Sequence, residues 1–344
     1  MSTSDIHILS TGTALPGSAI DNAALGKRFG MDALWEQWVD TFVGTKSRYL
    51  SFDLDSGEPF GRLADLGETA GRAALSAAGV EPGDIDAVVL GTATPDMLMP
   101  ATVNVIADRL EIDAVPTYQL QSGCTGAVQA LALARHLLRD DGIRTVLVLA
   151  GDTCTKYFDM DADYSELPPA ELINLVLFGD GAGAAVLSSE PRPGAPVLRE
   201  VFTRLVGGGL PPGHELDWFG PADKHEERPG VTEDYKAVEH LVPGLAGEVL
   251  GELLERLEWS AGEVDFLLPP QLSGRMTERI VAGLGMAEAE EVTCVAEVGN
   301  SGNALPFLQL DRLLTRMADG DRAVGVAIES SKWIKGGFAV ERVA

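Results

Sequence analysis

The segment Gly123-Cys124-Thr125-Gly126 places a thiol between two glycines, after an apolar run and before a stretch with helical spacing. Glycine permits a sharp turn, and a helix beginning here would present N–H groups and partial positive charge to the sulfur. Both favour the thiolate, the nucleophilic form of cysteine, and the N–H groups can hold a developing oxyanion. We therefore predict that Cys124 is a nucleophile, the alternative being a buried, inert cysteine. Cys154 and Cys294 lack this context and are interpreted as packing residues.

A second glycine-rich segment, residues 178–187, reads Phe-Gly-Asp-Gly-Ala-Gly-Ala-Ala-Val-Leu. Glycine-rich loops that bind dinucleotides lead into a helix, whereas this one leads into a β-rich run. It is therefore interpreted as a tight turn at a domain centre. The three cysteines are too few and too scattered for a disulfide framework or a zinc site, so no metal is expected.

Three blocks in the first part of the chain recur in the same order in the second part. The pairs are 75–86 with 254–265, 123–126 with 299–302, and 144–151 with 322–329. This order predicts an internal duplication with halves at 1–190 and 191–344, the alternative being a chance likeness between two βαβ units. Duplicated halves usually enclose a ligand site between them, so Cys124 and Asn300 are expected to face one another.

The elements that position these residues alternate between short β-rich runs and amphipathic helical stretches, the pattern of an α/β protein. A helix is expected over Ala127–Leu138, with one apolar face. The expected strands are Ile6–Ser10, Ala87–Gly91, Thr117–Gln121, Thr145–Ala150, Ala184–Leu187, Phe266–Leu268 and Val324–Ile328.

Composition limits the class of protein. The 344 residues suffice for about two domain-sized units, and 45% hydrophobic with 23% charged residues is typical of a globular protein. A net charge of −26 disfavours binding to nucleic acid or to anionic membranes. There is no membrane-spanning apolar run and no signal-peptide pattern, so we expect a cytoplasmic protein that acts on small molecules.

The chain resembles the β-ketoacyl-ACP synthase III family of the thiolase superfamily. The resemblance lies in the order of the motifs Gln121-Ser-Gly-Cys124-Thr-Gly-Ala, 178–184 and Gly299-Asn300-Ser-Gly-Asn-Ala, together with Thr11–Pro16 and Trp38–Arg48. It implies the five-layered αβαβα thiolase fold, a homodimer, and acyl transfer through a thioester on Cys124, with Asn300 as the second catalytic residue. It implies no permanently bound cofactor, since acyl groups arrive on coenzyme A or on the phosphopantetheine arm of an acyl carrier protein.

One departure concerns the family's catalytic histidine. Its Pro-His-Gln-Ala segment corresponds to residues 269–272, so the histidine position holds Pro270, which has no side chain that exchanges a proton. In this family the histidine and the asparagine together stabilise the enolate left by decarboxylation. Losing one of two such donors costs roughly 3–4 kcal/mol, so decarboxylative condensation is expected to be badly impaired. Formation of acyl-Cys124 depends mainly on the thiolate and its oxyanion hole, and is expected to survive.

A second departure lies where the family has a glycine-rich C-terminal stretch, which corresponds to residues 327–331. The N–H group of Ser331 could still complete the oxyanion hole. Glu329 could act as a general base towards an incoming alcohol or amine if burial raised its pKa. The alternative is a surface or salt-bridged Glu329 near Lys332.

Two further positions bear on the substrate carrier and on the missing base. Trp38 matches the tryptophan that stacks on the adenine of coenzyme A in the family, but Phe42 replaces the arginine that follows, which makes a carrier-protein donor more plausible. A carrier protein would need a basic patch on this acidic surface. His214 and His225 lie in the Gly/Pro-rich stretch 207–230, and either could replace the missing histidine.

Together these features predict an acyltransferase of specialised, polyketide-type biosynthesis. Cys124 would take an acyl group from a carrier-protein or coenzyme A thioester and pass it, without decarboxylation, to an alcohol, amine or thiol acceptor. The alternatives are a synthase that forms C–C bonds, with another group in place of the histidine, and a catalytically silent subunit that scaffolds an active homologue.

Overall fold

The computed structural model describes residues 5–158, 169–217 and 231–343. Ten strands form one sheet in the order β12-β11-β13-β14-β8-β1-β7-β6-β4-β5. Their bounds are β1 His7–Ala14, β4 Ala87–Thr92, β5 Thr117–Gln121, β6 Thr145–Thr153, β7 Asp180–Ser188, β8 Val197–Leu205, β11 Phe266–Leu268, β12 Glu290–Glu291, β13 Arg322–Glu329 and β14 Ile334–Glu341.

The strand order repeats itself from the two edges inward. One set reads β5-β4-β6-β7-β1 and the other β12-β11-β13-β14-β8. In each set the first three strands are parallel and the last two pair antiparallel to their neighbours. Within the sheet, β1 of one set pairs antiparallel with β8 of the other at His7 and Val197. This topology confirms the predicted duplicated α/β architecture.

Equivalent hydrogen bonds accompany the repeat. The Asp86 N–H donates to the Thr145 carbonyl at 2.8 Å, and its carboxylate accepts from the N–H groups of Arg144 and Thr145. In the second set the Asp265 N–H donates to the Arg322 carbonyl at 2.8 Å, and its carboxylate accepts from the Arg322 N–H. In each set, an aspartate at the equivalent position therefore ties the turn before a buried strand to the start of the neighbouring strand.

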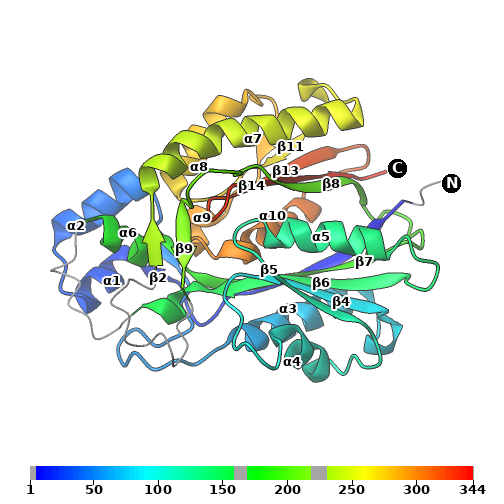
Figure 1. The fold of residues 1–344 in the computed structure, drawn as a ribbon, viewed down its shortest axis with the longest axis horizontal. Helices are drawn as coiled ribbons and strands as arrows, with labels where there is room; N and C mark the ends of the chain where they lie inside the picture. The colour runs from blue at the N-terminus through cyan, green and yellow to red at the C-terminus, as the bar shows by residue number, and fades with distance from the viewer. Residues whose placement is uncertain (1–4, 159–168, 218–230, 344) are drawn as a thin grey trace.

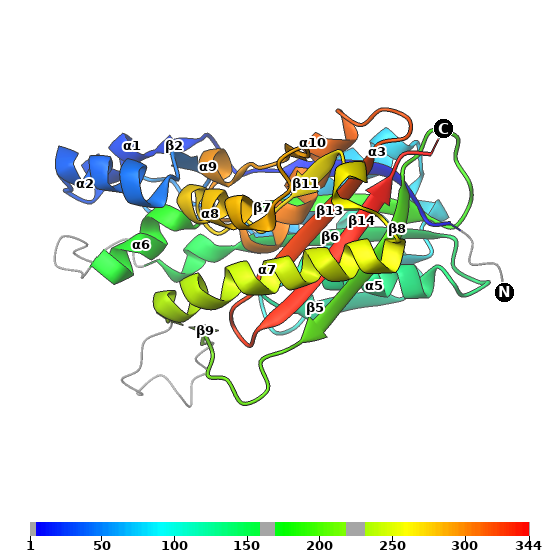
Figure 2. The same cartoon turned by 90° about the horizontal axis from the view of Figure 1, so that it is seen from above.

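Helices and strands stack in five layers (Figures 1 and 2). The outer helices are α3 (Leu63–Ala78) and α4 (Thr102–Arg109) on one side and α7 (Tyr235–Leu257) and α8 (Gly274–Leu284) on the other, with α5 (Gly126–Leu137) and α10 (Leu305–Leu314) between the strand layers. Along β4, Ala87 and Val89 enter the central core, whereas Val88 and Leu90 pack towards α3 and α4. Burial on both faces explains why this strand is a continuous apolar run.

The remaining elements cap one end of the sheet (Figure 1). They are β2 Ile20–Asp21, α1 Asn22–Arg28, α2 Ala33–Trp38, the π-helix Val39–Val43, β3 Ser47–Arg48, α6 Pro169–Leu177, β9 His214–Leu216, β10 Val231–Glu233 and α9 Val295–Val298. Short 3-10 helices span 82–84, 154–157, 261–263 and 302–304. No helix of the described ranges is long and apolar enough to cross a membrane.

The glycine-rich run is a strand rather than the predicted turn, because Asp180–Ser188 forms β7 with every residue buried. A Cβ at Gly183 would overlap Phe307 at the start of α10. Glycine here lets the central helix approach the sheet, so its role is packing. The other expected strands and the helix after Cys124 all form, most with ends shifted by one to four residues.

Candidate active site

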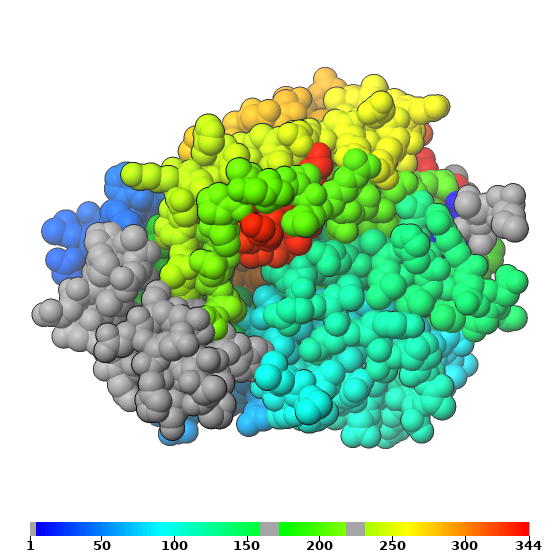
Figure 3. Space-filling view, in the orientation of Figure 1, coloured from blue at the N-terminus to red at the C-terminus, as the bar shows by residue number. Residues whose placement is uncertain are grey.

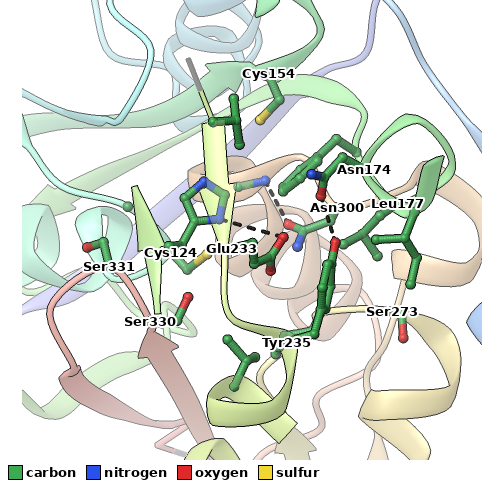
Figure 4. A pocket seen from close by; sticks show the side chains of 18 of the residues that line it. Cys124, Cys154, Asn174, Leu177, Glu233, Tyr235, Ser273, Asn300, Ser330 and Ser331 are labelled. Atoms are coloured by element: carbon green, nitrogen blue, oxygen red, sulfur yellow. Dashed lines mark hydrogen bonds and ion pairs between the residues drawn. The ribbon is translucent and has the colours of Figure 1, made fainter. Parts of the chain in front are cut away.

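A cavity of about 1080 Å³ opens between the two sets of strands, and Cys124, Asn300, Glu329 and Ser331 all line it. Figure 3 shows a hollow at the middle of the molecule. Atoms of the C-terminal segment (red) are visible in it, between the green to yellow-green region of β9 and β10 and the teal region of α5. Figure 4 shows Cys124 and Asn300 pointing into this space from different layers. The structure therefore brings together the four candidate residues that the sequence spreads over two hundred positions.

Cys124 lies in the turn between β5 and α5 and is partly buried. Burial raises the pKa of its thiol to about 12, and the negative charges of Glu329, Asp152 and Glu233 act in the same direction, against a backbone hydrogen bond that lowers it. The expectation that the helix start favours the thiolate is therefore wrong. A helix terminus contributes ~0.3–1 kcal/mol, less than one pKa unit, and burial beside three carboxylates outweighs it.

The turn of Cys124 is held by a fully buried asparagine from the other set of strands. The Asn303 amide donates to the Ser122 carbonyl at 3.0 Å and to Asp152 Oδ2 at 2.9 Å, and its oxygen accepts from the Ala127 N–H at 3.1 Å. Asp152 is 1% exposed and accepts further hydrogen bonds from residues 92–94 and from the Asn303 N–H. Burial raises the pKa of Asp152, while these hydrogen bonds oppose the rise.

Two glycines are required for this contact. A Cβ at Gly126 would lie 2.5 Å from Asn303 Oδ1, and a Cβ at Gly302 would overlap the Asp152 carboxylate. Gly302 also has a φ of +55°, in the left-handed region that favours glycine. The paired Gly-x-x-Gly turns of the sequence are therefore the sites at which the two sets of strands approach each other.

Glu329 ends β13 directly behind the Cys124 turn and is 5% exposed. Its carboxylate accepts hydrogen bonds from the hydroxyls of Ser122 and Thr125, each at 2.7 Å, and from the Ser331 hydroxyl. The Lys332 ammonium donates instead to a backbone carbonyl at 2.7 Å. The alternative of a surface glutamate is therefore wrong, and the carboxylate links the end of β13 to the turn that carries the thiol.

Asn300 is 5% exposed and occupies the turn equivalent to that of Cys124. Its backbone N–H donates to the Leu177 carbonyl at 2.7 Å, and its carbonyl accepts from the Gly179 N–H at 3.1 Å. Its side-chain oxygen accepts from the Gly302 N–H at 3.1 Å. With the oxygen engaged within the turn, the amide nitrogen is the group that Asn300 presents to the cavity.

Pro270 is buried in a segment that supports the fold. The Gln309 amide donates to the carbonyl of Pro269, and the Gln271 side chain accepts from the N–H groups of Cys294 and Val295 at the start of α9. Cys294 is a packing residue, as predicted. Cys154 is not, because it lines the cavity, where burial raises the pKa of its thiol.

His214 and Glu233 face each other across the two-stranded sheet of β9 and β10, and both line the cavity. Tyr235, at the start of α7, donates from its hydroxyl to Asn174 Oδ1 at 2.7 Å, and burial raises its pKa. His225, the other candidate histidine, lies outside the described residues. The sequence analysis did not identify Glu233, because nothing near it in the sequence indicates a partner. Only the pairing of β9 with β10 brings it opposite His214.

Trp38 lies at the end of α2, where it packs, partly buried, against the apolar cluster of the cap. Phe42, one turn later, is 68% exposed and lines the cavity together with Arg275 and Arg279 of α8. The Arg275 guanidinium donates to the Thr41 carbonyl at 2.9 Å, which fixes it beside Phe42. The cavity is therefore lined by two arginines beside Phe42, at the part of the wall that we call the rim, although the protein as a whole is acidic.

The chain belongs to the 3-oxoacyl-[acyl-carrier-protein] synthase III family. The family's sequence models match residues 118–204 and, for its C-terminal part, 254–330. A β-ketoacyl-[acyl-carrier-protein] synthase III of Streptomyces coelicolor is 30% identical over 325 residues, 91% of this chain and 90% of that protein. A Bradyrhizobium relative is 31% identical over 308 residues, 88% of each chain. Enzymes of this family act on acyl thioesters of coenzyme A or acyl carrier protein.

Solved structures agree in fold. The structure of AbyA1, described as a tetronic acid condensing enzyme, is 60% identical with a TM-score of 0.96 and covers 98% of this chain and 99% of its own. The priming β-ketosynthase of the R1128 polyketide pathway is 26% identical with a TM-score of 0.82, covering 98% of this chain and 96% of its own. The predicted thiolase fold is confirmed.

Replacing Asn303 by alanine should lower the free energy of unfolding by about 2–4 kcal/mol, because Asp152 and the Ser122 carbonyl would lose buried donors. Asn104→Ala, which removes an exposed side-chain hydrogen bond to Thr117, serves as the control and should cost less than about 1 kcal/mol. Urea unfolding of both variants measures the difference. If both variants lose the same free energy of unfolding, the buried hydrogen bonds of Asn303 do not stabilise the site more than an exposed one does.

Proposed function

We propose that this protein joins two thioester-bound acyl units into a cyclic ester of the tetronic acid type, by non-decarboxylative acyl transfer through Cys124. One observation carries the proposal: Cys124 and Asn300 share a cavity, and Pro270, which the resemblance to the family aligns with its histidine, is buried and has no side chain that exchanges a proton. The 60% identity to a tetronic acid condensing enzyme over almost the whole chain supports the choice of product.

The product's own structure defines the substrates. A tetronic acid is a five-membered cyclic ester with a second carbonyl, usually enolised, in the ring. Disconnecting its ester C–O bond and the C–C bond beside the second carbonyl leaves a 2-hydroxyacyl thioester and a 3-oxoacyl thioester. Joining them releases two thiols and no carbon dioxide, which agrees with the loss of the decarboxylating histidine.

The cycle begins when the Cys124 sulfur attacks the 3-oxoacyl thioester, with the N–H groups of Cys124 and Ser331 holding the oxyanion and the carrier thiol leaving. The hydroxyl of the second substrate then attacks acyl-Cys124, which forms the ester and frees the thiol. The acidic carbon between the two carbonyls next attacks the remaining thioester, closes the ring and releases the second carrier thiol. Asn300 presents its amide N–H to the carbonyl under attack.

We assign Glu329 a positioning role in this cycle. Its carboxylate already accepts three hydroxyl hydrogen bonds, two of them from the turn that carries Cys124. A general base must expose a lone pair to the proton that it removes, and here that would break one of these bonds. The same bonds hold the Cys124 turn against the end of β13.

For the donor we propose a carrier protein that docks near Arg275 and Arg279. Their guanidinium groups line the cavity beside the exposed Phe42, where the phosphate of a phosphopantetheine arm and an acidic carrier would meet positive charge. We also propose a homodimer. The exposed side chains of Leu98 (75%) and Met99 (85%) offer an apolar surface for it.

Incubation with 3-oxoacyl thioesters should add the intact acyl mass to the protein, and Cys124→Ala should abolish the adduct, because only this thiol is placed in the helix-start turn. Cys154→Ala is the matched control, since Cys154 lines the same cavity. Intact-protein mass spectrometry measures the adduct.

The same incubation with malonyl thioesters tests the decarboxylation route. Release of carbon dioxide should be about 100- to 1,000-fold slower than for a synthase that has the histidine. Decarboxylation at an ordinary rate would overturn the proposed reaction, and no adduct with any donor would favour the scaffolding subunit.

Glu329→Gln should slow formation and decay of acyl-Cys124 by similar factors, about 10- to 100-fold, because a displaced turn harms every step at the sulfur. Rapid-quench mass spectrometry follows the two half-reactions separately. If only decay in the presence of the hydroxyl acceptor falls, Glu329 is a general base.

Arg275→Glu combined with Arg279→Glu should lower the acylation rate from a carrier-protein donor about 10-fold, because electrostatic attraction at the rim is lost. The rate from the same acyl group on N-acetylcysteamine, which lacks the carrier and its phosphate, should change less than about 2-fold. Arg144→Glu combined with Arg316→Glu, two exposed changes away from the cavity with the same total change in charge, is the control. Equal losses with both donors would exclude a docking role.

A further inference from the structure

The imidazole of His214 and the carboxylate of Glu233 form a pair at the wall of the cavity that the cycle above leaves unused. His214 Nδ1 lies 3.9 Å from Glu233 Oε2, the ion pair that Figure 4 draws as a dashed line from Glu233. The Glu233 side chain is 9% exposed, and within the described residues its Oε2 accepts no hydrogen bond. The Tyr235 hydroxyl also interacts with this carboxylate, and the negative charge of Glu233 adds to the burial that raises the pKa of Tyr235.

The segment that ends at His214 is fixed to the turn after β13. The Gly213 N–H donates to the Ser330 carbonyl at 2.9 Å, and the Gly213 carbonyl accepts from the Asp234 N–H at 2.8 Å. The indole N–H of Trp333, which is 1% exposed, donates to the Pro211 carbonyl at 2.8 Å. These bonds hold β9 and β10 against the turn that follows β13. Ser330 and Ser331 of that turn line the same cavity as Cys124.

The orientation of the His214 ring is set from two sides. Its Nδ1 faces Glu233, and the Phe178 ring meets it edge-on at 85° with centroids 6.2 Å apart. The backbone of Phe178 in turn bridges to Asn300. With Nδ1 towards the carboxylate, Nε2 is the ring nitrogen that can exchange a proton with groups in the cavity.

We propose that His214, oriented by Glu233, is the base for Cys124, supplied by the β9–β10 hairpin in place of the histidine absent at Pro270. Nε2 takes the thiol proton as sulfur forms its bond to the thioester carbon, and returns that proton to the carrier thiolate as the old C–S bond breaks. In the second half-reaction it takes the proton of the acceptor hydroxyl and returns it to the departing Cys124 sulfur. This assignment rests on the acyl transfer proposed above.

The cavity makes such a base necessary. Burial and the carboxylates of Glu329, Asp152 and Glu233 raise the pKa of the Cys124 thiol to about 12, so at neutral pH the thiol holds its proton. The distance of 3.9 Å between His214 Nδ1 and Glu233 Oε2 is longer than a hydrogen bond, so the two groups interact mainly through charge and orientation. Glu233 is a positioning residue, because it acts through the imidazole.

The first test needs no acyl substrate. Alkylation of Cys124 by iodoacetamide at neutral pH, followed on its own peptide by mass spectrometry, should be at least about 10-fold slower in His214→Asn than in the parent protein. His136→Asn, which changes an exposed histidine of α5, is the control and should react at the parent rate. An unchanged rate in His214→Asn would overturn the proposal.

The second test uses the acyl donor that modifies the parent protein. His214→Gly should acylate about 100-fold more slowly, and added imidazole should recover at least a tenth of the parent rate by filling the vacated space. A folded variant, judged by its unfolding temperature, that loses activity without recovery would mean a structural role and would overturn the proposal. If the parent protein forms no acyl adduct, the proposed function fails, while the alkylation comparison still decides the role of His214.

The third test addresses Glu233. Nitrogen-15 shifts of the imidazoles should show His214 with its proton on Nδ1 in the parent protein, and Glu233→Gln should lose this preference without changing the unfolding temperature. The same variant should lower the acylation rate about 10-fold. If His214 keeps the same tautomer in Glu233→Gln, Glu233 does not position the imidazole, and this part of the proposal is wrong.

Discussion

The contact between Asn303 and Asp152 is the constraint on which the rest of the site depends. Asp152 belongs to one set of strands, yet its buried carboxylate receives two of its hydrogen bonds from the turn of the other set. Its Oδ1 accepts from residues 92–94 of its own set, whereas its Oδ2 accepts from Asn303, and a buried carboxylate oxygen that loses its donors costs about 1–3 kcal/mol. The same asparagine holds the Ser122 carbonyl and the Ala127 N–H on either side of the Cys124 thiol. Docking of the two sets and positioning of the nucleophile are therefore one event.

The electrostatics of the cavity follow from that docking. Joining the two turns brings Asp152 and Glu329 close to a thiol that already lies at a buried helix start, and the hairpin adds Glu233. Each carboxylate disfavours the thiolate, so the dipole of α5 alone does not supply a charged nucleophile. A site of this kind depends on proton transfer at the moment of attack. That is a different solution from a permanently ionised cysteine, and it suits the proposed reaction, in which a hydroxyl and a carbon acid must also lose a proton.

The repeated sheet also explains how the family's scaffold tolerates a proline at position 270. The segment around Pro270 packs against α9 and α10 through Gln271 and Gln309, contacts that depend little on the side chain at 270. The position can therefore change without loss of the fold, while the β9–β10 hairpin reaches the same cavity from outside the ten-stranded sheet. Segments outside the sheet can thus differ between members of the family while the architecture is retained.

Much of the protein was determined by sequence alone. The buried strands, the duplication and the two glycine turns could all be predicted, because apolar runs, repeated blocks and Gly-x-x-Gly spacing are local signals. They sufficed to place Cys124 and Asn300 in one cavity. Tertiary structure alone decided that the glycine-rich run is strand β7, that Glu329 accepts hydrogen bonds behind the turn, and that the Cys124 pKa rises rather than falls. The physical reason is common to all three: burial and hydrogen bonding of a side chain are set by neighbours far away in the chain, and spacing along the sequence carries no information about them.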